Sequence, residues 1–242
     1  MADYGESELV AQLRWLPVLE IILAAVFIIV AYVGFSYIKR TEQSNIWVGM
    51  ARETAHQLGR RVSAHAHGLA GVNAALAAGV DSIEHGSFLD DSSIKLFLER
   101  GAYHVPTIIA GMTVLEMAEG GIVLTPAQRE KALIVGVRIK EALGRSYRAG
   151  VPIAFGTDMG VGPHGQNARE FALMVEAGMT CADAIKAATL TAAQLLDVAD
   201  LTGSLAPGKS ADLIAVAGDP LTDITELERV KFVMAQGAVA LS

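Results

Sequence analysis

Three short stretches of the sequence end on side chains that can bind a metal ion. Residues 62–68 read VSAHAHG, residues 82–86 read SIEHG and residues 155–158 read FGTD. In each stretch, a run suited to a buried strand precedes an imidazole or a carboxylate. Parallel α/β barrels place their chemistry at the carboxyl ends of their strands. Because imidazole suits zinc, and bound zinc lowers the pKa of water to ~7, these stretches predict part of a metal-dependent hydrolase site.

Strand and helix signals alternate from residue 46 onward, which favours βα units and a parallel sheet. The sequence predicts four strands, over residues 61–66, 81–85, 103–107 and 151–157. It predicts helices over 46–59, 90–100 and 125–150. Three further helices are predicted: one that ends at Gly79, one that begins near Asn167 and one that begins after Thr180. The tail predicts short strands over 212–216 and 230–234. The predicted fold class is α/β, a half TIM-type barrel with a small C-terminal β region and one N-terminal transmembrane helix.

A four-stranded parallel sheet leaves two open edges with unpaired backbone groups. Its inner face is expected to carry Val62, Ala64, Ile83 and Val105 or their neighbours. Glu84 is expected to point away from the barrel lumen, because neighbouring strand residues alternate between faces. We therefore expect a protein partner, or a homo-oligomer, to cover the open half-barrel.

The transmembrane helix is predicted from residues 16–38, where Glu20 is the only charged side chain. A 23-residue helix is about 34 Å long at ~1.5 Å per residue, enough for a hydrocarbon core of roughly 30 Å. Trp15 and Tyr37 flank the run as interfacial anchors do. A buried helix is the alternative. A cleaved signal peptide fits poorly, because the leading segment is acidic rather than basic.

The orientation of this span follows from its flanking charges. Arg14 precedes it, whereas Lys39, Arg40 and Arg52 follow it. The positive-inside rule then places the amino terminus outside and the C-terminal domain in the cytoplasm. The predicted location is the membrane, which the chain crosses once.

The composition limits the domain count and the class of partner. The 242 residues divide into a predicted anchor and linker over 1–45, a half-barrel over 46–200 and a β-rich tail over 201–242. The net charge of −7 comes without a basic stripe, so we expect no nucleic acid partner. Cys181 is the only cysteine, which excludes an intrachain disulfide and a cysteine-rich zinc site.

Four motifs carry a resemblance to a known family. They read HAHG over 65–68, AGVDSIEHG over 78–86, GTDMGVGPHGQNAREF over 156–171 and GSLAPGKSADLIAV over 203–216. In this order, the stretch from about residue 51 to 242 resembles the carboxyl-terminal half of the amidohydrolase superfamily. Within it, the sequence looks like the imidazolonepropionase-like and Xaa-Pro dipeptidase-like branch.

The resemblance implies a role for each candidate residue. His65, at the end of the fifth barrel strand, and His85, at the end of the sixth, resemble metal ligands for zinc or another divalent ion. Asp158, at the end of the eighth, resembles both a metal ligand and the catalytic carboxylate that carries the proton. The implied substrate contacts are His67, Tyr103, His104 and His164. A structural histidine or a helix cap is the alternative for each.

The sequence also departs from the family pattern. A full member carries a His-x-His pair on its first strand and, in many branches, a bridging lysine on its fourth. Here no histidine precedes His56, and the only lysine before Lys95 is Lys39. We therefore expect the single chain to be catalytically incomplete.

Three functional hypotheses follow. The first is a membrane-anchored accessory or structural subunit of a membrane complex. The alternative is a metal-dependent hydrolase of C–N bonds, in amides, lactams or peptides, completed by a second chain or by self-association. The third is a truncated or fused reading frame whose product does not function alone.

Overall fold

The computed structural model describes residues 42–119 and 125–241. The predicted membrane span over 16–38 lies outside these residues, and the predicted division into 1–45, 46–200 and 201–242 stays a prediction. Among the described helices, none combines the length and the apolar character that crossing a bilayer requires.

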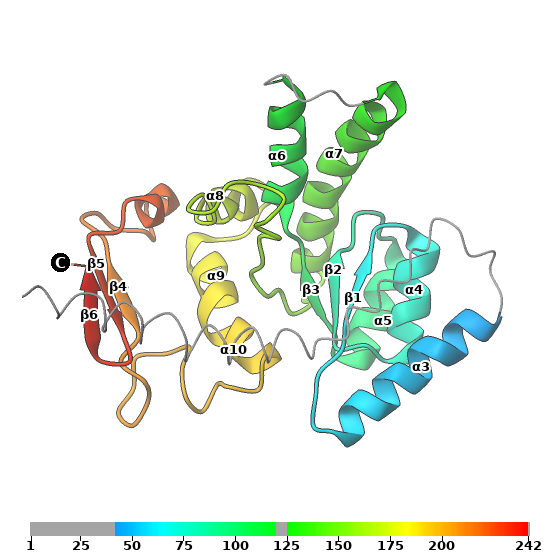
Figure 1. The fold of residues 1–242 in the computed structure, drawn as a ribbon, viewed down its shortest axis with the longest axis horizontal. Helices are drawn as coiled ribbons and strands as arrows, with labels where there is room; N and C mark the ends of the chain where they lie inside the picture. Colours follow the sequence, from blue (N-terminus) through cyan, green and yellow to red (C-terminus); the bar gives the residue numbers. More distant parts are fainter. Residues whose placement is uncertain (1–41, 120–124, 242) are drawn as a thin grey trace, which may run out of the picture.

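Of the two sheets in the described residues, one is parallel and has three strands. Its order is β1 (Ser63–Ala66), β2 (Ser82–His85) and β3 (Tyr103–Val105). The helices α3 (Glu42–Gln57), α4 (Leu69–Ala78) and α5 (Asp91–Arg100) lie together on one side of this sheet (Figure 1). This arrangement confirms the predicted βα units, and the fold is α/β and resembles part of a TIM barrel.

Local sequence signals define the ends of these helices. The Asp90 side chain accepts hydrogen bonds from the amides of Ser92 and Ser93, which caps α5 as the acidic start of the predicted helix indicates. At the other end, Gly101 adopts a left-handed conformation with φ of 64°, which a residue without a Cβ adopts at low cost. The prediction of a helix over 90–100 is confirmed.

The register of the strands separates an apolar face from a polar face. Ala64, Ile83 and His104 share the face that packs against the helices, and Ile83 is fully buried there. The opposite face carries Ser63 and His65 beside Ser82 and Glu84. The inner face therefore carries Val105, as expected, and the polar neighbours of Ala64 and Ile83. The expectation that Glu84 points away from the lumen is wrong.

The fourth predicted strand is shorter than expected. Residue Ile153 makes a single parallel bridge with His104, supported by hydrogen bonds from His104 N to Pro152 O (2.9 Å) and from Ala154 N to His104 O (3.1 Å). The next amide, that of Phe155, donates instead to Ala187 O at 3.0 Å. The segment 151–157 therefore contributes one bridge to the sheet and not the predicted strand.

A helical hairpin follows β3. It consists of α6 (Ile108–Glu119), which the sequence did not predict, and α7 (Pro126–Arg148), which was predicted over 125–150. Figure 1 shows both helices rising from the end of the sheet. Next come α8 (Arg169–Glu176), α9 (Cys181–Lys186), the π-helical turn η1 (Ala187–Thr191) and α10 (Ala192–Leu195).

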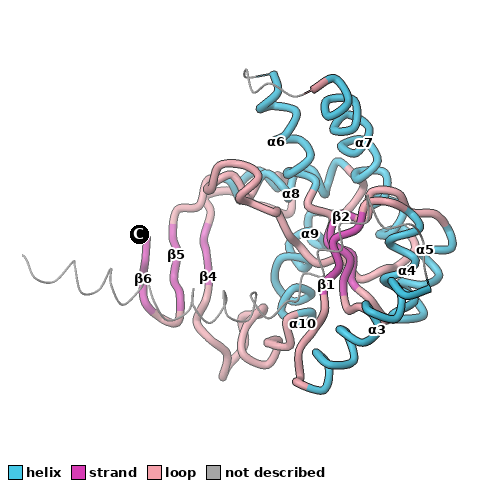
Figure 2. Tube along the Cα trace, turned by 45° about the vertical axis from the view of Figure 1, so that its right-hand side comes forward, coloured by secondary structure: helices cyan, strands magenta, loops and turns pink. Residues whose placement is uncertain are grey.

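The tail forms a separate antiparallel sheet of β4 (Leu213–Ala215), β5 (Phe232–Ala235) and β6 (Ala238–Leu241), with a short 3-10 helix, η2 (Ile224–Glu228), before β5. Helices α8 to α10 lie between the two sheets (Figure 2). The sequence predicted β4 and β5 but missed β6, which is joined to β5 by a tight turn at Gln236 and Gly237, both with positive φ.

Candidate metal centre

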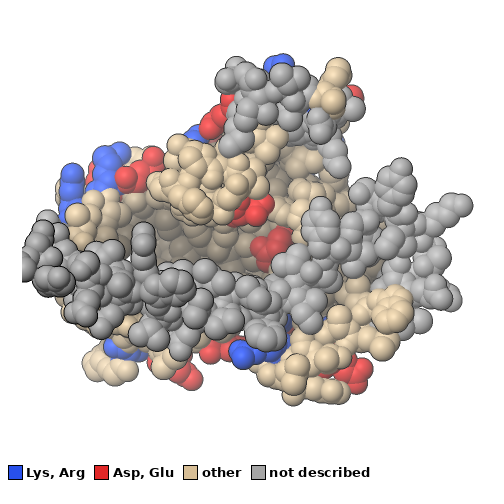
Figure 3. Space-filling model, in the orientation of Figure 1, with Lys and Arg blue, Asp and Glu red and all other residues tan. Residues whose placement is uncertain are grey.

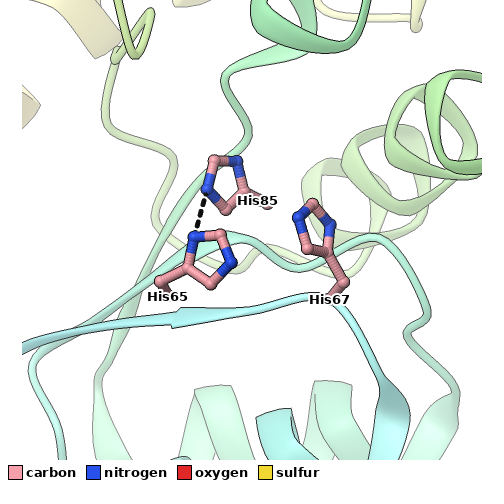
Figure 4. A group of neighbouring side chains, drawn as sticks. All are labelled: His65, His67 and His85. Carbon is pink, nitrogen blue, oxygen red and sulfur yellow. Dashed lines mark hydrogen bonds between the residues drawn. The ribbon is translucent and has the colours of Figure 1, made fainter. Parts of the chain in front are cut away.

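Three imidazoles meet where β1 and β2 end (Figure 4). One nitrogen of each of His65, His67 and His85 lies within 4.8 Å of one nitrogen of the other two. His65 Nδ1 and His85 Nε2 are 2.7 Å apart, and the rings of His67 and His85 are stacked with centroids 4.6 Å apart. Parallel pairing explains the meeting, because it places the carboxyl ends of neighbouring strands at the same edge.

His85 reaches this cluster because the backbone turns at its position. Regular alternation would place its side chain on the face opposite to Glu84 and His65. Its φ of 69° lies instead in the left-handed region, which is uncommon outside glycine. Gly86 follows with φ of 54°, and a Cβ there would lie 2.8 Å from His104 Nε2. The position after His85 therefore requires glycine.

A hydroxyl group determines which nitrogen of His85 carries the proton. Thr107 Oγ1 lies 2.6 Å from His85 Nδ1 and donates to Pro106 O at 2.7 Å. A hydroxyl has one proton, so both contacts are hydrogen bonds only if His85 Nδ1 donates to Thr107. His85 Nε2 is then the nitrogen with the lone pair, and it faces His65.

Burial favours the neutral forms of His65 and His85. Desolvation, followed by the neighbouring His67, His65 and His104, lowers the pKa of His85 to about 3. Desolvation also lowers the pKa of His65, although the charge of Asp158 acts in the opposite direction. The third imidazole, His67, has its Nδ1 2.8 Å from Ser87 Oγ. Neutral imidazole is the form that binds a metal ion.

Two carboxyl groups lie near the cluster. Asp158 has a φ of 50°, and burial raises its pKa while His65 lowers it. Glu84 lies on the same face as His65 and accepts hydrogen bonds from Ser63 Oγ at 2.6 Å and Ser82 Oγ at 3.1 Å. Burial raises the pKa of Glu84, and Asp158 adds to this effect. Asp158 therefore interacts electrostatically with both His65 and Glu84.

The other predicted substrate contacts lie outside the cluster. Tyr103 begins β3 and pairs with Ser82, which places it at the amino end of the sheet. His104 is fully buried on the helix-facing side, with Nδ1 3.0 Å from Ser146 Oγ and Nε2 3.1 Å from His85 O. His164 is exposed in the loop that follows Asp158. The geometry therefore gives His104 a packing role, because helices α5 and α7 cover it.

Sequence reasoning missed Thr107 and Glu170, which belong to the support of the cluster. Glu170 is fully buried, and its two carboxyl oxygens accept hydrogen bonds from the amides of Ile108 (2.9 Å) and Ile109 (2.7 Å). Burial raises its pKa to about 8, against the effect of these two donors. In the sequence, Glu170 is visible only as the glutamate of the NAREF segment. Its role as a cap cannot be inferred without knowing that α6 begins at Ile108.

The residues present fit a divalent metal ion. Three imidazoles with neighbouring carboxyl groups form a nitrogen and oxygen donor set of the kind that zinc prefers. Two of the three, His65 and His85, are predicted ligands, and His67 joins them although it was predicted as a substrate contact. Asp158, the third predicted ligand, is not part of the three-imidazole group.

Residues 28–240 match the sequence model of the amidohydrolase family. The chain belongs to this family. It is 39% identical over 185 residues to the ochratoxinase of Aspergillus niger, and 37% identical over 106 residues to the imidazolonepropionase of Geobacillus kaustophilus. Its fold is similar to the crystal structure of a Xaa-Pro dipeptidase with bound methionine in the active site, with a TM-score of 0.78 and 44% identity.

The chain spans only part of these relatives. The matches cover 75% of the chain but 37% of the ochratoxinase, 42% of the chain but 24% of the imidazolonepropionase, and 82% of the chain but 49% of the dipeptidase. This amidohydrolase-family chain therefore spans at most about half of the length of these relatives.

Proposed function

We propose that the chain contributes the carboxyl-terminal part of the active site of a metal-dependent hydrolase of C–N bonds, in amides, lactams or peptides. The observation that carries this proposal is the cluster of His65, His67 and His85 at the carboxyl ends of two parallel strands. Membership of the amidohydrolase family and the names of the relatives support the reaction class. The metal would be zinc or another divalent ion.

His65 and His85 would hold the ion, with His67 beside them and the carboxyl group of Asp158 near His65. A bound divalent ion would polarise the substrate carbonyl and lower the pKa of a water molecule to ~7. Asp158 would accept the proton of this water and transfer it to the leaving nitrogen. Hydrolysis would join the water oxygen to the carbonyl carbon and break the C–N bond, so the products would be an acid and an amine.

A second chain would complete the site. The parallel sheet has β1 at one edge, and beyond β3 it continues only through the single bridge at Ile153, so neither edge has a full neighbouring strand within the described part of the chain. The ligands that the family pattern places on the first four strands would come from this partner or from another copy of the chain. We expect little turnover by the purified chain alone.

The test is metal-dependent hydrolysis by the complex isolated with its native partners. Zinc or manganese is added, and N-acyl amino acids, Xaa-Pro dipeptides and lactams are the substrates. We expect turnover that His85→Asn abolishes and that His56→Asn leaves unchanged, because His56 contacts Asp81 outside the cluster. Turnover that survives His85→Asn, or no turnover in any native complex, would contradict the proposal.

Location and further partners rest on the sequence alone. We propose that residues 16–38 anchor the chain in the bilayer, with the amino terminus outside and the C-terminal domain in the cytoplasm. Carbonate extraction tests this, because release of the full chain from membranes by alkaline carbonate would exclude the anchor. We propose no nucleic acid partner, in keeping with the scattered basic and acidic side chains on the face in Figure 3.

A further inference from the structure

Glu170 is a buried carboxyl group that the proposed reaction does not use. It lies on α8, and its oxygens face the amides of Ile108 and Ile109, the first two residues of α6. The first amides of a helix have no partner inside the helix, so a buried helix start needs an acceptor from elsewhere. An apolar side chain at position 170 would be easier to bury but would leave both amides unsatisfied.

The residue immediately before α6 is Thr107, whose hydroxyl contacts His85. Thr107 is 3% exposed and has a φ of 52°, which is unfavourable for a β-branched residue. Its carbonyl accepts a hydrogen bond from Ala110 N at 3.2 Å, so its conformation continues into the first turn of the helix. Glu170 therefore holds the segment that positions the Thr107 hydroxyl.

We propose that Glu170 is a positioning residue of the metal centre: by capping α6 it keeps Thr107 in the left-handed conformation in which Thr107 Oγ1 accepts the Nδ1 proton of His85. His85 Nε2 is then held as the ligand atom, although Glu170 makes its hydrogen bonds to α6 alone. This inference rests on the proposed function, in which His85 binds the metal. It adds a buried group 85 positions away in the sequence to the support of one imidazole.

The test reads the protonated nitrogen of His85 in the metal-free, full-length chain by ¹⁵N NMR. We expect the Nδ1–H form in the native sequence. Thr107→Val removes the acceptor and Glu170→Gln removes one of the two oxygens of the cap, so both should give a mixture with the Nε2–H form. Thr107→Ser should keep the Nδ1–H form, because serine keeps the hydroxyl group.

Thr180→Ala is the matched control, because the Thr180 hydroxyl caps α9, away from His85. It should lower stability and leave the His85 signal unchanged. If Glu170→Gln does not fold, Glu170→Asp replaces it, since the shorter side chain cannot reach both amides. A folded Glu170 variant that keeps the Nδ1–H form of His85 would overturn the inference.

Zinc affinity, measured by competition with a chelator, gives a second readout. Changes to residues that orient metal ligands typically weaken metal affinity by roughly 10–100-fold, and we expect a loss in this range for Glu170→Gln and none for Thr180→Ala. If the native chain and its complex bind no zinc, the proposed function fails. The NMR measurement still decides the role of Glu170, because it needs no metal.

Discussion

The two ends of strands β1 and β2 are both polar, but their polar groups differ in kind. At the amino ends, Arg61 contacts Asp197 at 2.6 Å and Asp81 at 3.0 Å, and Asp81 also accepts hydrogen bonds from Val62 N and His56 Nε2 at 2.7 Å. At the carboxyl ends, imidazoles face one another. Charges at the amino ends are thus paired, whereas at the carboxyl ends burial lowers the pKa values of His65 and His85 and so favours their neutral forms.

Positive φ values are more frequent at the carboxyl ends than at the amino ends, where Asp197 has a φ of 57°. His85, Thr107 and Asp158 all have positive φ, and each follows or ends one of the parallel segments. Such conformations are unfavourable for residues other than glycine and gather at functional sites. In barrels of this kind the amino ends contribute stability and the carboxyl ends contribute chemistry. The comparison predicts that substitutions at the two ends affect different properties.

The largest effect is expected for His85→Asn. Removing a ligand should weaken zinc binding by roughly a thousandfold, or about 4 kcal/mol. The free energy of unfolding should change little, because asparagine tolerates the left-handed conformation. Chelator competition and urea denaturation measure the two quantities. If His85→Asn binds zinc as tightly as the native chain, the carboxyl ends of the strands do not form the metal site.

Asp81→Ala should show the opposite pattern. It removes the acceptor of Val62 N and a partner of both Arg61 and His56, so we expect unfolding to become easier by about 3 kcal/mol. Zinc affinity should stay the same. Denaturation of the zinc-free chain measures the first quantity, and a large loss of zinc affinity in a folded Asp81→Ala chain would show that the two ends are coupled.

The buried Glu170 should make stability depend on pH. Its pKa is raised from 4.5 to about 8 in the folded chain, so the native state binds this proton more tightly than the unfolded state. Its contribution to stability is therefore complete below pH 4.5 and is lost as the pH rises toward 8. Between pH 5.5 and 7.5 this loss amounts to about 2–3 kcal/mol.

Glu170→Gln isolates this contribution. The difference in unfolding free energy between the native chain and this variant should change with pH over that range. A pH-independent difference would show that Glu170 has an ordinary pKa.

The smallest effect is expected at an exposed ion pair. Arg138 and Glu141 are one turn apart on α7, and both side chains are more than half exposed. Arg138→Ala should change stability by no more than ~0.5 kcal/mol and should leave zinc binding unchanged. A larger change would mean that the α7 surface contacts a partner.

The sequence predicted the parts of the fold that have local signals. The helix over 90–100 was correct because Asp90 and Gly101 mark its ends, and the strands that end on His85 and near His65 were correct because their motifs lie beside them. The segment 151–157, predicted as a strand, forms only one bridge, and its hydrogen bond from Phe155 N to Ala187 O has no local signal in the sequence.

The candidate site was predictable in its ligands and not in its support. HAHG and SIEHG identified two of the three clustered imidazoles, but alternation misplaced Glu84 because it does not foresee the turn at His85. Thr107 and Glu170 depend on a contact between α6 and α8, about sixty residues apart. No local pattern contains that information.

The most direct test of the metal centre is anomalous diffraction at the zinc edge from crystals of the full chain, alone or with its partner, soaked in zinc. The structure predicts a peak ~2.0–2.1 Å from His85 Nε2, with His65 as a second ligand. The matched His85→Asn crystal should lose this peak. A chain that shows no peak between His65 and His85 at saturating zinc, or a peak only at an exposed residue such as His164, would contradict the assignment.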